Sequence, residues 1–173
     1  MRTNRSRLLI ALLTLPFLGS CSRSATTEEI LFENPMSKLT GVLTRSGVAL
    51  DMENTSDGNG SLKLVATEPT TFRLFELNDI DVEDARLAYR ARVRTEEIQG
   101  QAYLEMWCQI SGRGEFFSRS LHSPLKGTTE WTSQETPFFL EKDQNPDSIK
   151  LNVVIDGSGA VWVDQIVLAK GSR

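Results

Sequence analysis

The clearest candidate binding group in this sequence is a set of four side chains at alternate positions: Tyr103, Glu105, Trp107 and Gln109. Residues two apart on a strand project from the same face, so a strand here would present aromatic, carboxylate and amide groups together. Aromatic rings stack on the apolar C–H faces of sugars, and convergent polar groups bind the sugar hydroxyls. Arg90 and Arg92 alternate in the same way on a preceding segment, and we predict that they add guanidinium groups to this glycan-binding candidate.

A structural interpretation of the same residues remains open. Arg90 and Arg92 would form cross-strand ion pairs with Glu105, as opposite charges on neighbouring strands do. A loop such as Gly112–Pro124 would then cover the aromatic side chains.

The segment Ser111–Ser123 is predicted to be a long loop with two adjacent phenylalanines, Phe116 and Phe117, followed by Arg119. Its phenylalanines either rim a binding cleft or pack on the core and on a strand edge. His122 in this loop is the only histidine of the chain, and no second histidine or spaced cysteine joins it as a zinc ligand. We expect His122 to be a surface or capping residue.

Motifs of enzyme chemistry are missing from the sequence. A serine hydrolase would have to use the single histidine, and there is no Gly-x-Ser-x-Gly elbow. Glycoside hydrolysis needs two carboxylates about 5–10 Å apart, and no spacing of the acidic residues singles out such a pair. There is also no phosphate-binding loop and no dinucleotide fingerprint. We therefore expect a protein without enzyme activity.

Length and composition favour a single globular domain. The chain has 173 residues, of which 39% are hydrophobic and 24% charged, which suffices for one core. Its 19 basic and 23 acidic residues give a net charge of −4, and without a basic excess no nucleic-acid partner is expected. Two cysteines are too few for a disulfide framework. Cys108 lies in an alternating segment and is expected to be a small buried hydrophobe.

Residues after Ile30 alternate between apolar and polar, and no long segment has helical periodicity. The clearest predicted strands are residues 85–95, 102–110, 149–155 and 161–168. The last pattern breaks at Asp164-Gln165, as a β-bulge would break it. We predict a tight hairpin at Asp156–Gly159 and a link between the two central strands at Ile98–Gln101. Many short strands with such turns indicate an all-β sandwich or barrel, and we predict one domain over residues 30–170.

The first twenty residues have the pattern of an export signal. Three arginines and no acid precede the apolar segment Leu8–Gly19, which is too short for a membrane span of about 20 residues. The segment Leu18-Gly19-Ser20-Cys21 resembles a bacterial lipobox. This resemblance implies a signal peptide over 1–20, cleavage before Cys21 and acylation of its thiol and amino group. Several acyl chains would form a stable membrane anchor. An ordinary signal peptide followed by a chance cysteine is the alternative.

Such cleavage would leave residues 21–29 as the acylated cysteine and a polar tether. The loss of three arginines would leave 16 basic and 23 acidic residues, a net charge of −7, which opposes adhesion to anionic lipid. Ser22 stands where lipoproteins retained in the inner membrane often carry Asp. The resemblance therefore indicates a lipid-anchored protein of the bacterial cell envelope, at the outer membrane.

The mature chain resembles galactose-binding-like jelly-roll domains, in particular the carbohydrate-binding modules of bacterial xylanases and cellulases. The segments that carry the resemblance occur in the family's order: residues 31–35, 57–63, 89–95 with 100–104, and 127–132 with 159–164. The resemblance implies a jelly-roll β-sandwich that binds a glycan on one face. It also implies a structural calcium site at Glu33, Asp57 and Asp164, and we expect no other cofactor. Alternatively, Asp57 closes an Asx-turn and Asp164 is hydrogen-bonded within the fold.

These observations lead to one functional hypothesis and one alternative. The hypothesis is a membrane-anchored lipoprotein whose non-catalytic domain recognises a polysaccharide weakly through the face around Trp107. The alternative is a structural or adaptor lipoprotein that binds another envelope protein through the same face, since an aromatic, arginine-containing patch also suits a protein partner. Competition by free sugar would distinguish the two.

Overall fold

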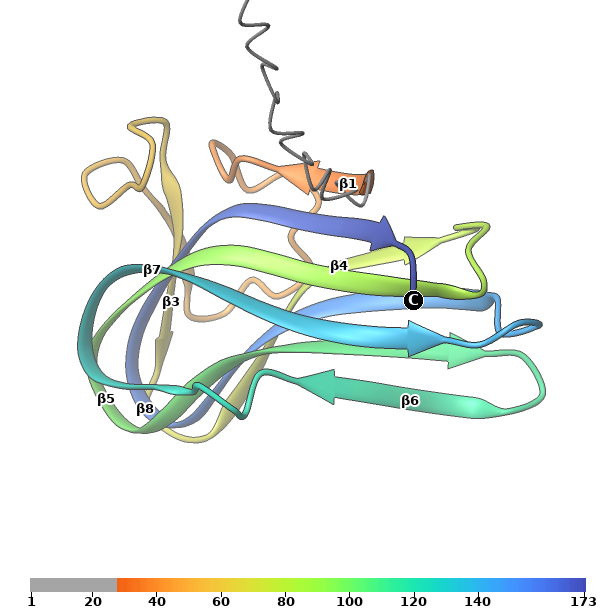
Figure 1. Cartoon of the computed structure of the whole chain (residues 1–173). Coiled ribbons are helices and arrows are strands. Elements are labelled where there is room, and N and C mark those ends of the chain that lie inside the picture. Colours follow the sequence, from red (N-terminus) through yellow and green to blue (C-terminus); the bar gives the residue numbers. More distant parts are fainter. Residues whose placement is uncertain (1–27) are drawn as a thin grey trace, which may run out of the picture.

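The computed structural model describes residues 28–173 (Figure 1). The predicted signal peptide at 1–20, the lipidation site Cys21 and most of the predicted tether lie outside the described residues. Over the described range the chain consists of β-strands joined by turns, which confirms the all-β prediction. No helix of this range is long and apolar enough to cross a membrane.

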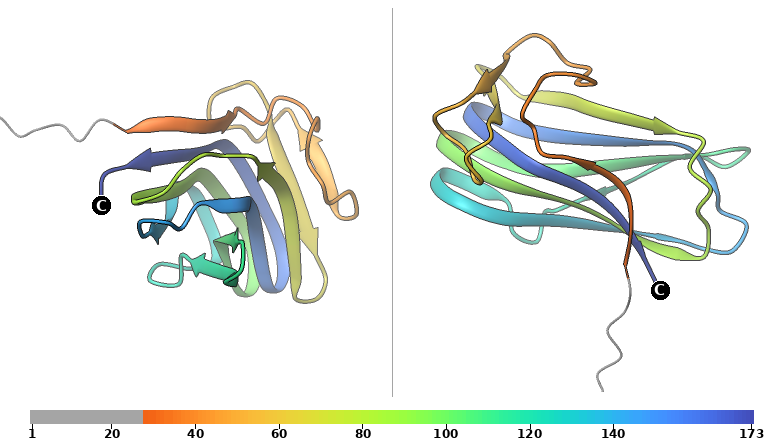
Figure 2. Two further views of the ribbon diagram at one scale, coloured as in Figure 1. Left: turned by 90° about the vertical axis from the view of Figure 1, so that its right-hand side faces the viewer. Right: turned by 90° about the horizontal axis from the view of Figure 1, so that it is seen from above.

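Two very long strands dominate the fold. The described strands are β1 (Glu29–Asn34), β2 (Val48–Asp51), β3 (Ser61–Ala66), β4 (Thr70–Asn78), β5 (Ala85–Ile110), β6 (Gly114–Arg119), β7 (Leu125–Leu140) and β8 (Pro146–Gly171). β5 and β8 have 26 residues each and pair antiparallel along nearly their whole length. They bend together, so that each contributes one half to each of two layers (Figure 1, Figure 2).

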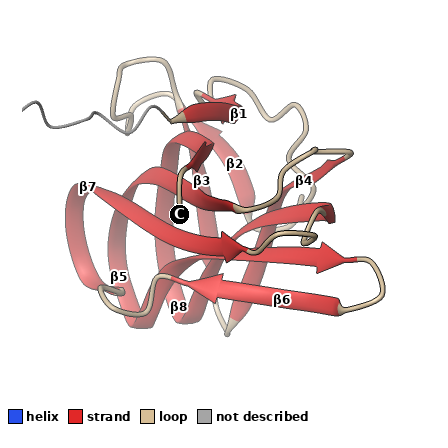
Figure 3. Cartoon of the chain, turned by 45° about the vertical axis from the view of Figure 1, so that its right-hand side comes forward, coloured by secondary structure: helices blue, strands red, loops and turns tan. Residues whose placement is uncertain are grey.

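The two layers enclose the core. One layer, called the β7 layer here, joins the first half of β5 to β7 and the second half of β8, which also pairs with β1 and β3. The other, the β6 layer, has the order β4–β8–β5–β6 (Figure 3). Leu87 and Tyr89 from one half of β5 and Leu104 and Met106 from the other half are fully buried between the layers. The predicted alternation of both segments is thereby confirmed.

Glycines make the shared bend of β5 and β8 possible. Gly100 pairs with Gly157 at the corner and has a φ of 102°. A Cβ atom at Gly100 would collide with the carbonyl oxygen of Asp156. The predicted hairpin at 156–159 and link at 98–101 are therefore wrong, because both segments lie inside continuous strands. Glycine at positive φ serves a sharp bend within a strand as well as a turn, so the sequence signal is the same.

Two local predictions are confirmed. The ladder between β5 and β8 shifts between Arg90 and Arg92, and Gln165 has a φ of 48°, as expected for a bulge. Cys108 is a free, buried cysteine, and burial raises the pKa of its thiol to about 12.

Trp162 is buried next to β2 on the outer face of the β7 layer, on the side opposite to the core residues Val161 and Val163. Its Nε1 donates a hydrogen bond of 2.7 Å to Oδ2 of Asp51. The Nζ atom of Lys63 lies 4.6 Å from the centre of the indole ring. Partial burial raises the pKa of Asp51, but hydrogen bonds from the backbone N–H of Asn54 and from the indole outweigh it and hold this pKa well below the usual range.

Candidate functional site

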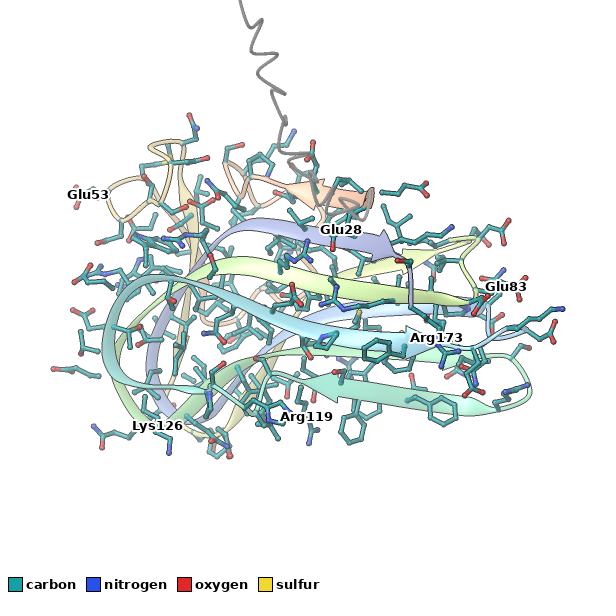
Figure 4. The ribbon with its side chains drawn as sticks, in the orientation of Figure 1. Glu28, Glu53, Glu83, Arg119, Lys126 and Arg173 are labelled. Atoms are coloured by element: carbon teal, nitrogen blue, oxygen red, sulfur yellow. The ribbon has the colours of Figure 1, made fainter. Side chains whose placement is uncertain are left out.

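The outer face of the β6 layer carries a groove of about 360 Å³ lined by side chains of all four strands. The strand pairing aligns four of them in a row across the layer: Arg73 on β4, Asn152 on β8, Glu105 on β5 and Arg119 on β6. Figure 4 labels Arg119 at the end of β6. The rest of the lining is Thr71, Trp107, Glu115 and Lys150. The groove is therefore assembled from segments far apart in the sequence.

Glu105 is the centre of this row. Its side chain is only 3% exposed, and both of its carboxylate oxygens are engaged. Nε of Arg119 donates to Oε2 at 2.6 Å, and Nδ2 of Asn152 donates to Oε1 at 3.1 Å. A carboxylate withdrawn from water needs such partners. Glu105 therefore holds the two side chains on either side of it in fixed positions.

The side-chain oxygen of Asn152 is a hydrogen-bond acceptor without a partner among the described residues. This Oδ1 atom is buried, and the amide nitrogen of the same side chain is held by Glu105. Buried polar atoms in folded proteins are nearly always satisfied, by protein, by water or by a ligand. Asn152 is among the residues that line the groove, so this buried oxygen lies next to it and is a candidate acceptor for a ligand hydroxyl.

An aromatic platform borders the polar row. Trp107 on β5 faces Phe117 on β6, with ring centres 5.0 Å apart and planes inclined by 43°. Phe117 is 51% exposed, and Cζ of Arg119 lies 4.4 Å from its ring centre. Exposed rings beside fixed hydrogen-bonding groups give a surface that binds the apolar and the polar sides of a sugar at once.

The structure places all four alternating residues of β5 on this outer face, but at different depths. Glu105 and Trp107 line the groove. Tyr103 pairs with Val154 of β8 outside the groove lining and is largely buried, and this burial raises the pKa of its phenol. Gln109 is half-buried and pairs with Glu115 of β6. Of the four predicted residues, only the middle two, Glu105 and Trp107, therefore line the groove.

Arg90 and Arg92 are not brought to the groove. They project from the β7 layer, because the bend of β5 turns the outer faces of its two halves to opposite sides of the sandwich. Arg90 donates to the carboxylates of Glu28 (Nη2 to Oε1, 2.7 Å) and Glu135, and this contact holds the pKa of Glu28 below its usual value. Arg92 donates to hydroxyl and backbone oxygens of β7. The predicted ion pairs of both arginines with Glu105 are wrong.

Two groove residues, Arg73 and Asn152, were missed by sequence reasoning, and the segment that holds Phe117 and Arg119 was assigned the wrong structure. Arg73 and Asn152 lie on strands whose outer face was not examined for binding groups. Phe117 and Arg119 were assigned to a loop, whereas the structure forms β6 from 114–119. In β6, Phe116 and Phe117 are adjacent and both exposed. The sequence of this strand therefore does not alternate between apolar and polar residues, and its periodicity does not indicate a strand.

The three carboxylates proposed for calcium do not form a ligand group. No cluster of three histidine, cysteine or acidic side chains in residues 28–173 is placed to hold a metal ion. Oδ2 of Asp164 accepts hydrogen bonds from the backbone and hydroxyl of Ser56 at 2.9 and 2.7 Å, and Oδ1 of Asp57 closes a turn on the N–H of Asn59 at 2.9 Å. Calcium binding that includes Glu33 thus rests on the resemblance alone. Its test is whether EDTA lowers the melting temperature.

Comparisons with known proteins identify the fold. No protein-family model and no curated sequence matches this chain. The CBM22-1 xylan-binding domain of Xyn10C from Paenibacillus barcinonensis is similar in structure, with a TM-score of 0.62 and 17% identity over 87% of this chain and 99% of that domain. This chain has the fold of carbohydrate-binding modules. The jelly-roll sandwich prediction is thereby confirmed.

Two further solved structures support this assignment of the fold. TmCBM61 in complex with β-1,4-galactotriose has a TM-score of 0.53 and 12% identity, over 81% of this chain and 97% of that one. A family 16 carbohydrate-binding module has a TM-score of 0.52 and 13% identity, over 70% and 84%. At these identities the likeness concerns the fold, and the ligand has to be argued from the groove.

Proposed function

We propose that this protein is a non-catalytic carbohydrate-binding protein whose ligand lies in the groove of the β6 layer. The observation that carries the proposal is the aromatic pair Trp107–Phe117 beside a fixed polar row with a free buried acceptor on Asn152. The fold supports it, because solved structures of this fold include a xylan-binding domain and a galactotriose complex. The groove is lined by only eight residues, so we expect weak binding that strengthens along a polymer with repeated units.

We propose further that the chain is anchored to the outer membrane through acylated Cys21. The support is the signal-like sequence of residues 1–20 and the lipobox resemblance. The described chain starts at Glu28 and enters β1, which lies on the side of the sandwich opposite to β6 (Figure 1).

The experiment is affinity electrophoresis of the purified protein through gels that contain plant, algal or bacterial polysaccharides. We expect retardation by at least one polymer, and its loss in Trp107→Ala. Trp131→Ala is the matched control, since Trp131 is a half-buried tryptophan of β7, outside the groove. Equal retardation of wild type and a folded Trp107→Ala variant would contradict this placement of the site.

A protein partner is the second candidate function. It is favoured by the exposed phenylalanines of neighbouring edges, Phe116 and Phe139, which are 44% and 53% exposed and line one hollow. If no polysaccharide retards the protein, crosslinking in intact envelopes followed by capture should yield a partner. Free sugar should not compete with that partner.

A further inference from the structure

The groove has one more basic than acidic side chain. It contains three basic and two acidic side chains, in a chain whose net charge is −4. Both acids are already paired inside the groove, Glu105 with Arg119 and Glu115 with Lys150. The third base is Arg73. Among residues 28–173 no carboxylate lies within ion-pair distance of its guanidinium, which is exposed at the β4 edge of the groove.

The position of Arg73 in the sheet indicates where a ligand that binds its unpaired charge would lie. Arg73 is paired in register with Asn152, whose Oδ1 is the unpartnered buried acceptor. Trp107 lies on β5, two strands away from β4, which corresponds to about 10 Å at the usual strand spacing. On β8, Lys150 pairs with Trp107 and Asn152 pairs with Arg73. A ligand that stacks on Trp107 and reaches Arg73 must therefore cross β8 between Lys150 and Asn152 and be longer than one sugar ring.

Building on the proposed carbohydrate-binding function, we propose that the groove selects an acidic glycan, with a uronic-acid carboxylate at Arg73 and a neighbouring sugar ring on Trp107. A guanidinium binds a planar carboxylate through two parallel N–H···O bonds, a match that neutral hydroxyls do not offer. A hydroxyl of the intervening sugar donates to Oδ1 of Asn152. A neutral glycan would occupy the same platform and leave the charge of Arg73 without a counter-ion.

The test compares each acidic polysaccharide with its own carboxyl-reduced form, which has the same backbone without the charge. A glucuronoxylan, a pectate and an alginate are each used in both forms, in affinity electrophoresis of the purified protein. We expect one acidic form to bind about tenfold more tightly than its reduced partner, the effect of one charge-assisted hydrogen-bond pair. Arg73→Gln should abolish this difference and keep the binding of the reduced form. Lys126→Gln, which removes the same charge from an exposed position outside the groove, should leave the difference intact.

The other outcomes separate the two proposals. Equal binding of acidic and reduced forms, or an unchanged preference in Arg73→Gln, overturns the acidic-glycan proposal and leaves carbohydrate binding in place. Failure to bind either form of any polymer overturns carbohydrate binding itself. If dextran sulfate retards the protein as strongly as the acidic polysaccharide does, the groove attracts polyanions in general. That result would also overturn the selection of a uronic acid.

Discussion

Replacement of Glu105 tests whether this buried carboxylate fixes the polar row of the groove. In Glu105→Leu, the shape is roughly kept while Arg119 and Asn152 lose their shared acceptor. In Glu105→Gln, the amide oxygen still accepts from Arg119, and the new N–H donates to Oδ1 of Asn152 once the Asn152 amide turns over, because its Nδ2 faces Glu105 in the wild type. The two variants therefore separate the loss of a charge from the loss of all hydrogen bonding.

The exposure of the two partners sets the expected size of the effect. Glu105 is 3% exposed, whereas Arg119 is 34% exposed and regains water when its partner is removed. Breaking a fully buried pair costs about 3–5 kcal/mol, and an exposed pair contributes about 0–1 kcal/mol. We expect Glu105→Leu to lower the free energy of unfolding by about 2–3 kcal/mol, mainly through the unpaired Asn152 amide. Glu105→Gln should cost about 1 kcal/mol, because neutral hydrogen bonds replace charge-assisted ones.

Urea unfolding followed by tryptophan fluorescence measures both values. The matched control is Glu115→Leu, which breaks the exposed ion pair with Lys150 and should cost less than about 0.5 kcal/mol. If Glu105→Leu is no more destabilising than Glu115→Leu, the carboxylate does not organise the groove. If Glu105→Gln is as damaging as Glu105→Leu, the charge alone matters and the hydrogen-bond argument fails.

Three further predictions concern the rest of the fold. Gly100→Ala should lower the free energy of unfolding by about 3 kcal/mol through collision and backbone strain, whereas Gly112→Ala, with a similarly positive φ but open space around it, should cost about 1 kcal/mol in the same urea assay. Because the pKa of Asp51 is lowered by folding, the stability that it contributes is complete above about pH 4 and is lost as the pH falls further. The difference in free energy of unfolding between wild type and Asp51→Asn should therefore shrink from pH 6 to pH 3, and a constant difference would contradict the assignment. The buried Cys108 thiol, with a pKa raised to about 12, should not react with a disulfide reagent at pH 8 until the protein is unfolded; reaction at the rate of free cysteine in native protein would show that it is accessible.

The sequence revealed the alternation of the central strands but not the placement of these strands in space. Alternation in 85–95 and 102–110 reports one buried and one exposed face for each segment, and both were identified correctly. The alternation does not show on which of the two outer faces of the sandwich the exposed side chains lie. Arg90 and Trp107 were therefore grouped together, although the bend at Gly100 separates them to opposite layers.

The remaining groove residues depend on contacts between distant segments. Arg73 lies on β4, where the register shifts between Arg73 and Phe75 and obscures the period of two. Phe117 is exposed on an edge strand, and its role appears only when Trp107 is seen beside it. Pairing across 79 residues of chain, from Arg73 to Asn152, is set by the whole fold and leaves no local trace in the sequence.

The glycines at the bend of β5 and β8 should be under a different evolutionary constraint from the groove residues. Gly100 and Gly157 hold the bend that both long strands need, whatever lies in the groove. Arg73 and Trp107 line only the groove. In lineages that switch from one glycan to another, the corner glycines should stay fixed while the groove positions diverge. Distant relatives of this chain would then be recognised by their paired glycines rather than by their binding residues.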